Sequence, residues 1–93
     1  MARISRNFDG RPDDEIFEKV HEVMEKIAQE FSLDYRQNEK LRQGEVSKMG
    51  ITGKFSVKSG EVVVDMKYPM LVPGSMRQKI EGHIERKLDG LFA

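Results

Sequence analysis

Residues 12–31 read PDDEIFEKVHEVMEKIAQEF, and this stretch decides the fold. Pro12 suits a first-turn position, and the acidic run 13–15 places negative charge at the positive end of a helix dipole. Apolar residues recur at the spacing of one helical face, within an arc of about 140°. They are Ile16, Phe17, Val20, Val23, Met24, Ile27, Ala28 and Phe31. No single strand could cover such a stripe, so the remaining chain must build a surface for it.

Composition is that of one charge-rich globular domain, residues 1–93. Sixteen basic residues balance sixteen acidic ones, so no global field draws the chain to nucleic acid. The absence of Cys removes disulfides, thiolate catalysis and the usual structural zinc sites. No apolar run approaches the roughly 20 residues of a membrane span, and the N-terminus lacks the apolar core of a signal peptide. We therefore expect an intracellular, cytoplasmic protein with no membrane span.

The clearest evidence for a hairpin comes from residues 51–68. Apolar and polar residues alternate on both sides of Ser59-Gly60, which supplies a two-residue turn. This turn predicts the cross-strand pairs Lys58–Glu61, Val57–Val62, Phe55–Val64, Lys54–Asp65 and Ile51–Tyr68. All apolar members then share one face, and the other face gains two opposite-charge pairs.

The other segments follow the same two periodicities. Residues 1–8 alternate weakly, as an edge strand does, and residues 33–37 alternate as a half-buried strand. After a turn at 38–40, the return strand lies within 41–49, where Gly44 is interpreted as marking a bulge.

A second helix runs towards the C-terminus. Ser75-Met76-Arg77-Gln78 is interpreted as its capping box. Its apolar residues recur at helical spacing and are Met76, Ile80, Ile84, Leu88 and Leu91. The predicted fold is α+β, in the order βαββββα, an antiparallel sheet with two helices packed on one face.

Few residues suggest chemistry. His21 and His83 fall beside the apolar stripes of the two helices, where a facing pair could bind a metal or sense pH. We favour two boundary residues that pack a ring edge, because metal sites usually recruit more ligands. The glycines form no phosphate-binding loop. We therefore predict no catalytic residue, no cofactor site and no metal site, and we do not expect an enzyme.

Basic clusters and surface carboxylates have an ordinary interpretation. Solubilising charge explains the following residues better than RNA binding or acid–base catalysis does: Arg3, Arg6, Arg11, Arg36, Lys40, Arg42, Glu18, Glu22, Glu25 and Glu30.

The segment Tyr68–Met76 places large apolar residues in a connection flanked by prolines. It either tucks under the second helix as core or projects as an apolar docking loop. We favour the core. If the segment is exposed, the candidate apolar contact residues are Met70, Leu71, Val72 and Met76.

Three stretches carry a resemblance to a known family. They are Phe31-Ser32-Leu33-Asp34-Tyr35, Gly50-Ile51-Thr52-Gly53-Lys54-Phe55 and the tail from Ile80 to Phe92. In these, and over roughly residues 3–92, the chain resembles the polyhydroxyalkanoic acid system proteins, named for genes near polyester-granule loci in bacteria. The resemblance implies a cytosolic protein associated with storage-polymer granules or their metabolism. It supplies no catalytic residue.

Two functions remain open from the sequence. The first is a non-enzymatic accessory protein that contacts a polyhydroxyalkanoate granule or a granule-bound protein. The second is a binder of a small apolar, acyl-type ligand between helices and sheet, where the inward-facing Gly53 could leave space. An exposed sheet edge also leaves pairing with a second copy open.

Overall fold

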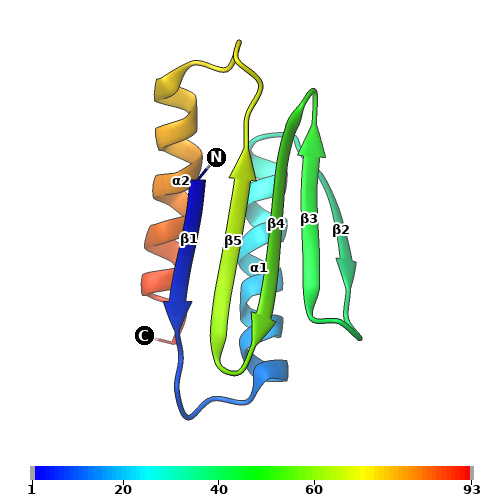
Figure 1. Ribbon diagram of the computed structural model, residues 1–93, viewed down its shortest axis with the longest axis vertical. Coiled ribbons are helices and arrows are strands. Elements are labelled where there is room, and N and C mark those ends of the chain that lie inside the picture. Colours follow the sequence, from blue (N-terminus) through cyan, green and yellow to red (C-terminus); the bar gives the residue numbers. More distant parts are fainter. Residues whose placement is uncertain (1, 93) are drawn as a thin grey trace.

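The structure is a computed structural model that describes residues 2–92, and it has the predicted order of elements (Figure 1). These are β1 (Ala2–Asn7), α1 (Asp13–Glu30), β2 (Asp34–Asn38), β3 (Gln43–Lys48), β4 (Ile51–Lys58), β5 (Glu61–Lys67) and α2 (Gly74–Asp89). The strands form one antiparallel sheet in the order β1-β5-β4-β3-β2. The predicted α+β fold is confirmed, with β1 and β2 at the two edges.

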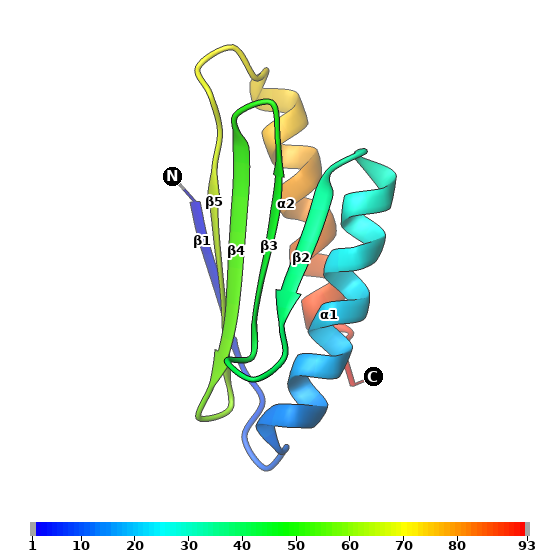
Figure 2. The ribbon, with the colours of Figure 1, turned by 90° about the vertical axis from the view of Figure 1, so that its right-hand side faces the viewer.

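Both helices lie on the same face of the sheet (Figure 2). The predicted stripe of α1 is buried from Ile16 to Ala28, and α2 buries Ile80, Ile84 and Leu88 against it. From the sheet, Phe55 is 2% exposed and Val64 is fully buried, so the helices cover the face that the alternation predicted. Burial of these apolar side chains provides the main driving force for folding.

The hairpin register between β4 and β5 is confirmed from Lys58–Glu61 to Thr52–Lys67. The ladder ends there, so the predicted Ile51–Tyr68 pair lies just beyond it. Lys54 and Asp65 are opposite each other, but the Asp65 carboxylate accepts a hydrogen bond from Nε of Arg3 at 2.8 Å. The sequence could not reveal this competitor, because β1 joins the sheet beside β5 only in the tertiary structure.

The interpretation of Gly44 as a bulge is wrong. Gly44 pairs regularly with Gln37 on one side and with Phe55 on the other. A Cβ atom at position 44 would collide with the Phe55 ring, which occupies the space above the glycine. Gly44 is therefore needed for close packing and not for a change of strand register.

Both helices begin differently from the prediction. α1 starts at Asp13, after Pro12 in an extended conformation, and α2 starts at Gly74, after Pro73 in the same conformation. Neither N-cap residue makes a side-chain hydrogen bond, so the predicted capping box at Ser75 is absent. Ser75 already lies inside the first turn, because Pro73 fixes the start of the helix at Gly74, two residues earlier than a serine cap at position 75 requires.

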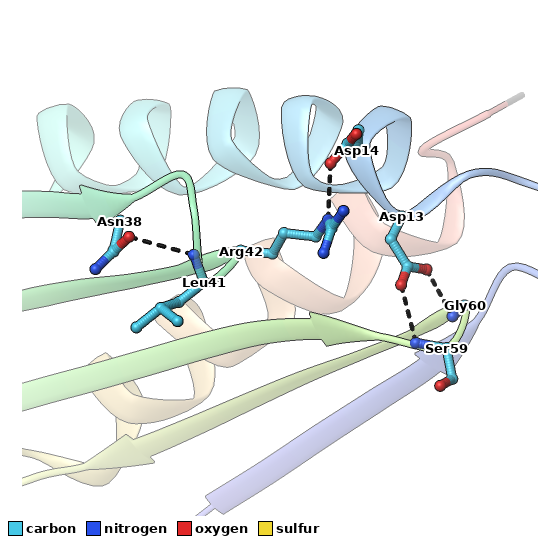
Figure 3. A network of polar contacts seen from close by, with 7 residues as sticks. All are labelled: Asp13, Asp14, Asn38, Leu41, Arg42, Ser59 and Gly60. Atoms are coloured by element: carbon cyan, nitrogen blue, oxygen red, sulfur yellow. Dashed lines mark hydrogen bonds and ion pairs between the residues drawn. The ribbon is translucent and has the colours of Figure 1, made fainter.

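A carboxylate at the start of α1 holds the β4–β5 turn (Figure 3). Oδ2 and Oδ1 of Asp13 accept hydrogen bonds from the backbone N–H groups of Ser59 (3.1 Å) and Gly60 (2.9 Å). Beside it, Nε of Arg42 donates to Oδ1 of Asp14 at 2.7 Å. These contacts join the first turn of α1 to two sheet connections at the lower end of the molecule in Figure 1.

Asp13→Ala should lower the free energy of unfolding by about 1–3 kcal/mol, because two backbone donors lose a charged acceptor. Asp14→Ala is the matched control: it removes the same charge from the same helix end, but its side chain is 82% exposed. Its ion pair with Arg42 should contribute less than about 1 kcal/mol. Urea denaturation measures both variants, and equal losses would contradict the special role of Asp13.

Candidate functional site

The connection from β5 to α2 contains a hydrogen-bonded turn. The N–H of Val72 donates to the carbonyl of Pro69 at 3.1 Å, with Met70 and Leu71 as the two central residues. Met70 is 99% exposed and Leu71 is 95% exposed. The prediction that this segment belongs to the core is therefore wrong for these two residues. The turn is closed by its own hydrogen bond and needs nothing from α2, so it projects beyond the end of the helix (Figure 1).

The base of the connection is packed. Val72 and Met76 are half-buried against the core, as is Tyr68. Burial, followed by the nearby Glu81 carboxylate, raises the pKa of the Tyr68 hydroxyl. Two of the four predicted contact residues, Met70 and Leu71, are thus presented to solvent on a base that the other two help to hold.

The β3–β4 turn lies against this connection. A Cβ atom on Gly50 would lie 3.2 Å from Cγ of Pro69. Met49, which precedes Gly50, is 89% exposed. We call Met49, Met70 and Leu71 the apolar tip. Figure 2 shows both connections at the same end of the molecule.

The residue types at the apolar tip are not those that favour the turn conformations found there. Met49 has φ of +51°, a left-handed conformation in which Asn and Gly are favoured and a long side chain costs about 1 kcal/mol. Central turn positions such as 70 and 71 are normally occupied by Gly, Asn, Asp or Ser. Sequence reasoning missed Met49. A methionine in the first position of a two-residue hairpin turn is unusual, and this could have indicated a role other than forming the turn. Folding does not explain these side chains, which makes the tip the candidate contact surface.

Basic residues surround the apolar tip. Segments 46–54 and 66–80 together contain five basic residues and no acidic one: Lys48, Lys54, Lys67, Arg77 and Lys79. Lys54 lies along β4, and we call the other four the basic rim. All four are exposed, and within residues 2–92 none of them forms an ion pair.

An acidic segment lies at the opposite end of the molecule. Residues 9–15, which lead into α1 at the lower end of Figure 1, contain four carboxylates and one arginine. The longest dimension of the molecule is 40 Å, and the two charged regions lie at its two ends. The arginines nearer this lower end are paired, Arg6 with Asp89 and Arg11 with Glu15. Residues 9–15 are therefore a locally acidic segment far from the basic rim, although the net charge of the chain is zero.

The two histidines have different partners. Nδ1 of His21 lies 2.8 Å from the Tyr35 hydroxyl, and burial, with a smaller effect of Glu25, raises the pKa of Tyr35 to about 12. His83 lies edge-on to Phe31, with its Nε2 3.5 Å from Oε1 of Glu30. In the part of the chain that the structure describes, no three potential metal ligands gather.

The expected space at Gly53 is absent. A Cβ atom there would collide with the Met66 sulfur and would touch Val46, so these side chains already fill the inward face. An open hollow of about 410 Å³ lies instead on the uncovered face of the sheet. Its lining includes Arg36, Lys54, Glu45 and Asp65, which mix both signs of charge and indicate no single ligand.

Comparison with known families gives a match over nearly the whole chain. The family described as "Putative polyhydroxyalkanoic acid system protein" covers residues 3–92. The chain belongs to this family. The resemblance found in Phe31–Tyr35, Gly50–Phe55 and the C-terminal tail is thereby confirmed. No curated protein matches the sequence.

The family name connects the chain with a polyhydroxyalkanoate system and specifies no molecular activity. Within residues 2–92, neither helix of this polyhydroxyalkanoic acid system protein combines the length and apolarity that crossing a bilayer requires.

Proposed function

We propose that this polyhydroxyalkanoic acid system protein is a non-enzymatic, cytoplasmic accessory protein that attaches to the surface of polyhydroxyalkanoate granules through the apolar tip. The observation that carries the proposal is the near-complete exposure of Met49, Met70 and Leu71 on two adjoining turns. Such exposure is unfavourable in water and becomes favourable when the side chains enter an apolar surface.

A granule surface suits the tip better than a granule-bound protein does. A stable protein–protein interface buries about 800 Å² on each partner, which three side chains on narrow turns do not supply. Side chains that project from turns can instead enter a deformable apolar layer without a complementary groove. Methionine is suited to this, because its flexible thioether adapts to irregular surfaces.

The expected strength is modest. Removing a fully exposed Met or Leu side chain from water contributes about 1.5–3 kcal/mol, so the tip supplies roughly 5–9 kcal/mol before the cost of orienting the protein. This predicts reversible attachment. The alternative function, a binder of an acyl-type ligand between helices and sheet, has lost its motivating observation because Met66 and Val46 fill the space beside Gly53.

The double variant Met70→Asp/Leu71→Asp should lose granule binding by at least about tenfold, because it replaces apolar transfer with two charges. Asp is well accepted in a turn, so the melting temperature should stay within a few degrees. Co-sedimentation with purified granules and with amorphous polyhydroxybutyrate particles measures the binding.

Leu41→Asp is the matched control, since Leu41 is also an exposed apolar residue, at 60%, but lies in the β2–β3 connection away from the tip. It should bind like the unmodified protein. Equal binding by the tip variant would remove the tip's role, and failure of the unmodified protein to sediment would refute granule attachment. Binding to native granules that disappears after protease treatment of their surface would identify a granule protein as the partner instead.

A further inference from the structure

Resting on the proposed function, we infer that the basic rim makes the apolar tip selective for surfaces that carry anionic phospholipid. Insertion of three side chains gives only marginal attachment, and stable attachment of a peripheral protein normally combines an apolar insertion with a basic patch. The four rim residues supply that second contribution: Lys48, Lys67, Arg77 and Lys79.

The position of the rim follows from the fold. Lys48 immediately precedes the Met49–Gly50 turn, and Lys67 is the last residue of β5, before the connection that carries Met70. Arg77 and Lys79 lie in the first turns of α2, which has no acidic residue in its first turn to compensate the positive end of the helix. When the tip enters a surface, all four cations come close to its headgroups.

The charges of the rim are available. Elsewhere, Arg3, Arg6 and Arg42 each bind a carboxylate at 2.7–2.8 Å. The rim residues have no such partner within residues 2–92, so an external anion displaces no internal ion pair.

The acidic segment 9–15 is far from the rim. Electrostatic interactions in solution are screened over about 8 Å at physiological ionic strength. The acidic residues 9–15 lie towards the other end of a molecule 40 Å long. A negative surface therefore attracts the rim, while the carboxylates of residues 9–15 lie beyond the range at which they would be repelled.

Binding to anionic phospholipid explains both the basic rim and the apolar tip, whereas binding to nucleic acid explains only the basic rim. Recognition of single-stranded nucleic acid combines basic residues with aromatic side chains on which bases stack. The tip has only Met49, Met70 and Leu71, and Tyr68 is half-buried beneath it. A lipid layer accepts the apolar side chains below its headgroups and the cations among them.

The test uses phosphatidylcholine vesicles with or without about 30 mol % phosphatidylglycerol, which sets the negative surface potential. The affinity of the full chain for the anionic vesicles, measured by co-sedimentation, should be at least about tenfold higher than for the neutral ones. Each basic residue near an anionic surface raises the affinity by about fivefold. Raising NaCl from about 0.1 M to 1 M, which shortens the screening length from about 10 Å to 3 Å, should remove most of this difference.

A quadruple Lys/Arg→Gln variant of the basic rim should lose binding on the order of 100-fold, with effects that are not fully additive. The matched control carries Lys19→Gln, Lys26→Gln, Lys58→Gln and Lys87→Gln, four exposed lysines outside the rim with the same change in net charge. It should lose less than about threefold. Circular dichroism establishes that both variants are folded.

Equal binding to neutral and anionic vesicles, or equal losses in the rim and control variants, would overturn the inference. Sedimentation with lipid-free polyhydroxybutyrate particles but with no vesicle would also overturn it and leave granule attachment standing. Failure to bind polymer, granules and vesicles alike would refute both proposals. If the Met70→Asp/Leu71→Asp variant binds anionic vesicles as well as the unmodified protein does, the attraction is by charge without insertion. This result would also overturn the inference.

Discussion

Val64→Lys is expected to unfold the protein, whereas Val63→Lys should leave it folded. Val64 is fully buried beneath the helices, while Val63 is half-exposed on the uncovered face of the sheet. A lysine at position 64 would place an unpaired charge in the core, at a cost of more than about 4 kcal/mol. Domains of this size have only about 5–14 kcal/mol of total stability.

Position 63 is a matched control, because it carries the same residue in the same strand and differs only in the face. A lysine there would lie between Glu61 and Asp65 on the same face of β5, where opposite charges are favourable. Thermal denaturation and the dispersion of amide NMR signals measure the outcome. A folded Val64→Lys variant, or an unfolded Val63→Lys variant, would mean that β5 is displaced by one residue.

Gly44→Ala is expected to have the second largest effect, a loss of roughly 2–4 kcal/mol in the free energy of unfolding. The added methyl group collides with the Phe55 ring, which has little room to move. Phe55 is 2% exposed and stacks on Phe17 at 5.9 Å and on Tyr35 at 6.5 Å between ring centroids. Relief of the collision would disturb the packing of α1 on the sheet.

Two further variants isolate this collision. Gly74→Ala should cost little, because nothing lies within 4 Å of a Cβ atom there and α2 begins at that residue. In a Phe55→Leu background the smaller side chain leaves space, so Gly44→Ala should cost at least about 1 kcal/mol less than it does alone. Chemical denaturation of the two single variants and the double variant measures this coupling. Strictly additive losses would contradict the proposed contact.

Local patterns in the sequence were sufficient for most of the secondary structure. The 3.6-residue period of 16–28 predicted α1, and alternation around Ser59-Gly60 predicted the β4–β5 hairpin with its register. Both signals succeed because they depend on neighbours a few residues apart in the chain. The starts of the helices differ from the prediction, since Pro12 and Pro73 cap them with backbone geometry and without a side-chain hydrogen bond.

The sequence predicted only part of the candidate site. Met70 and Leu71 were among the predicted contact residues, but their apolar character equally suggested burial. Only the hydrogen bond from Val72 to Pro69 shows that the turn closes on itself and projects both side chains. Met49 belongs with them because Gly50 lies close to Pro69, two residues that are distant in sequence.

The sequence by itself determined the order of elements, the two apolar helical stripes and the face of the sheet that the helices cover, because each follows from the local spacing of apolar residues. Tertiary structure decided the pairing of Asp65 with Arg3, the packing of Phe55 over Gly44 and the meeting of two turns in one apolar tip. These contacts depend on which strands become neighbours. That choice is made by the burial of the whole core, and no periodicity within a single segment records it.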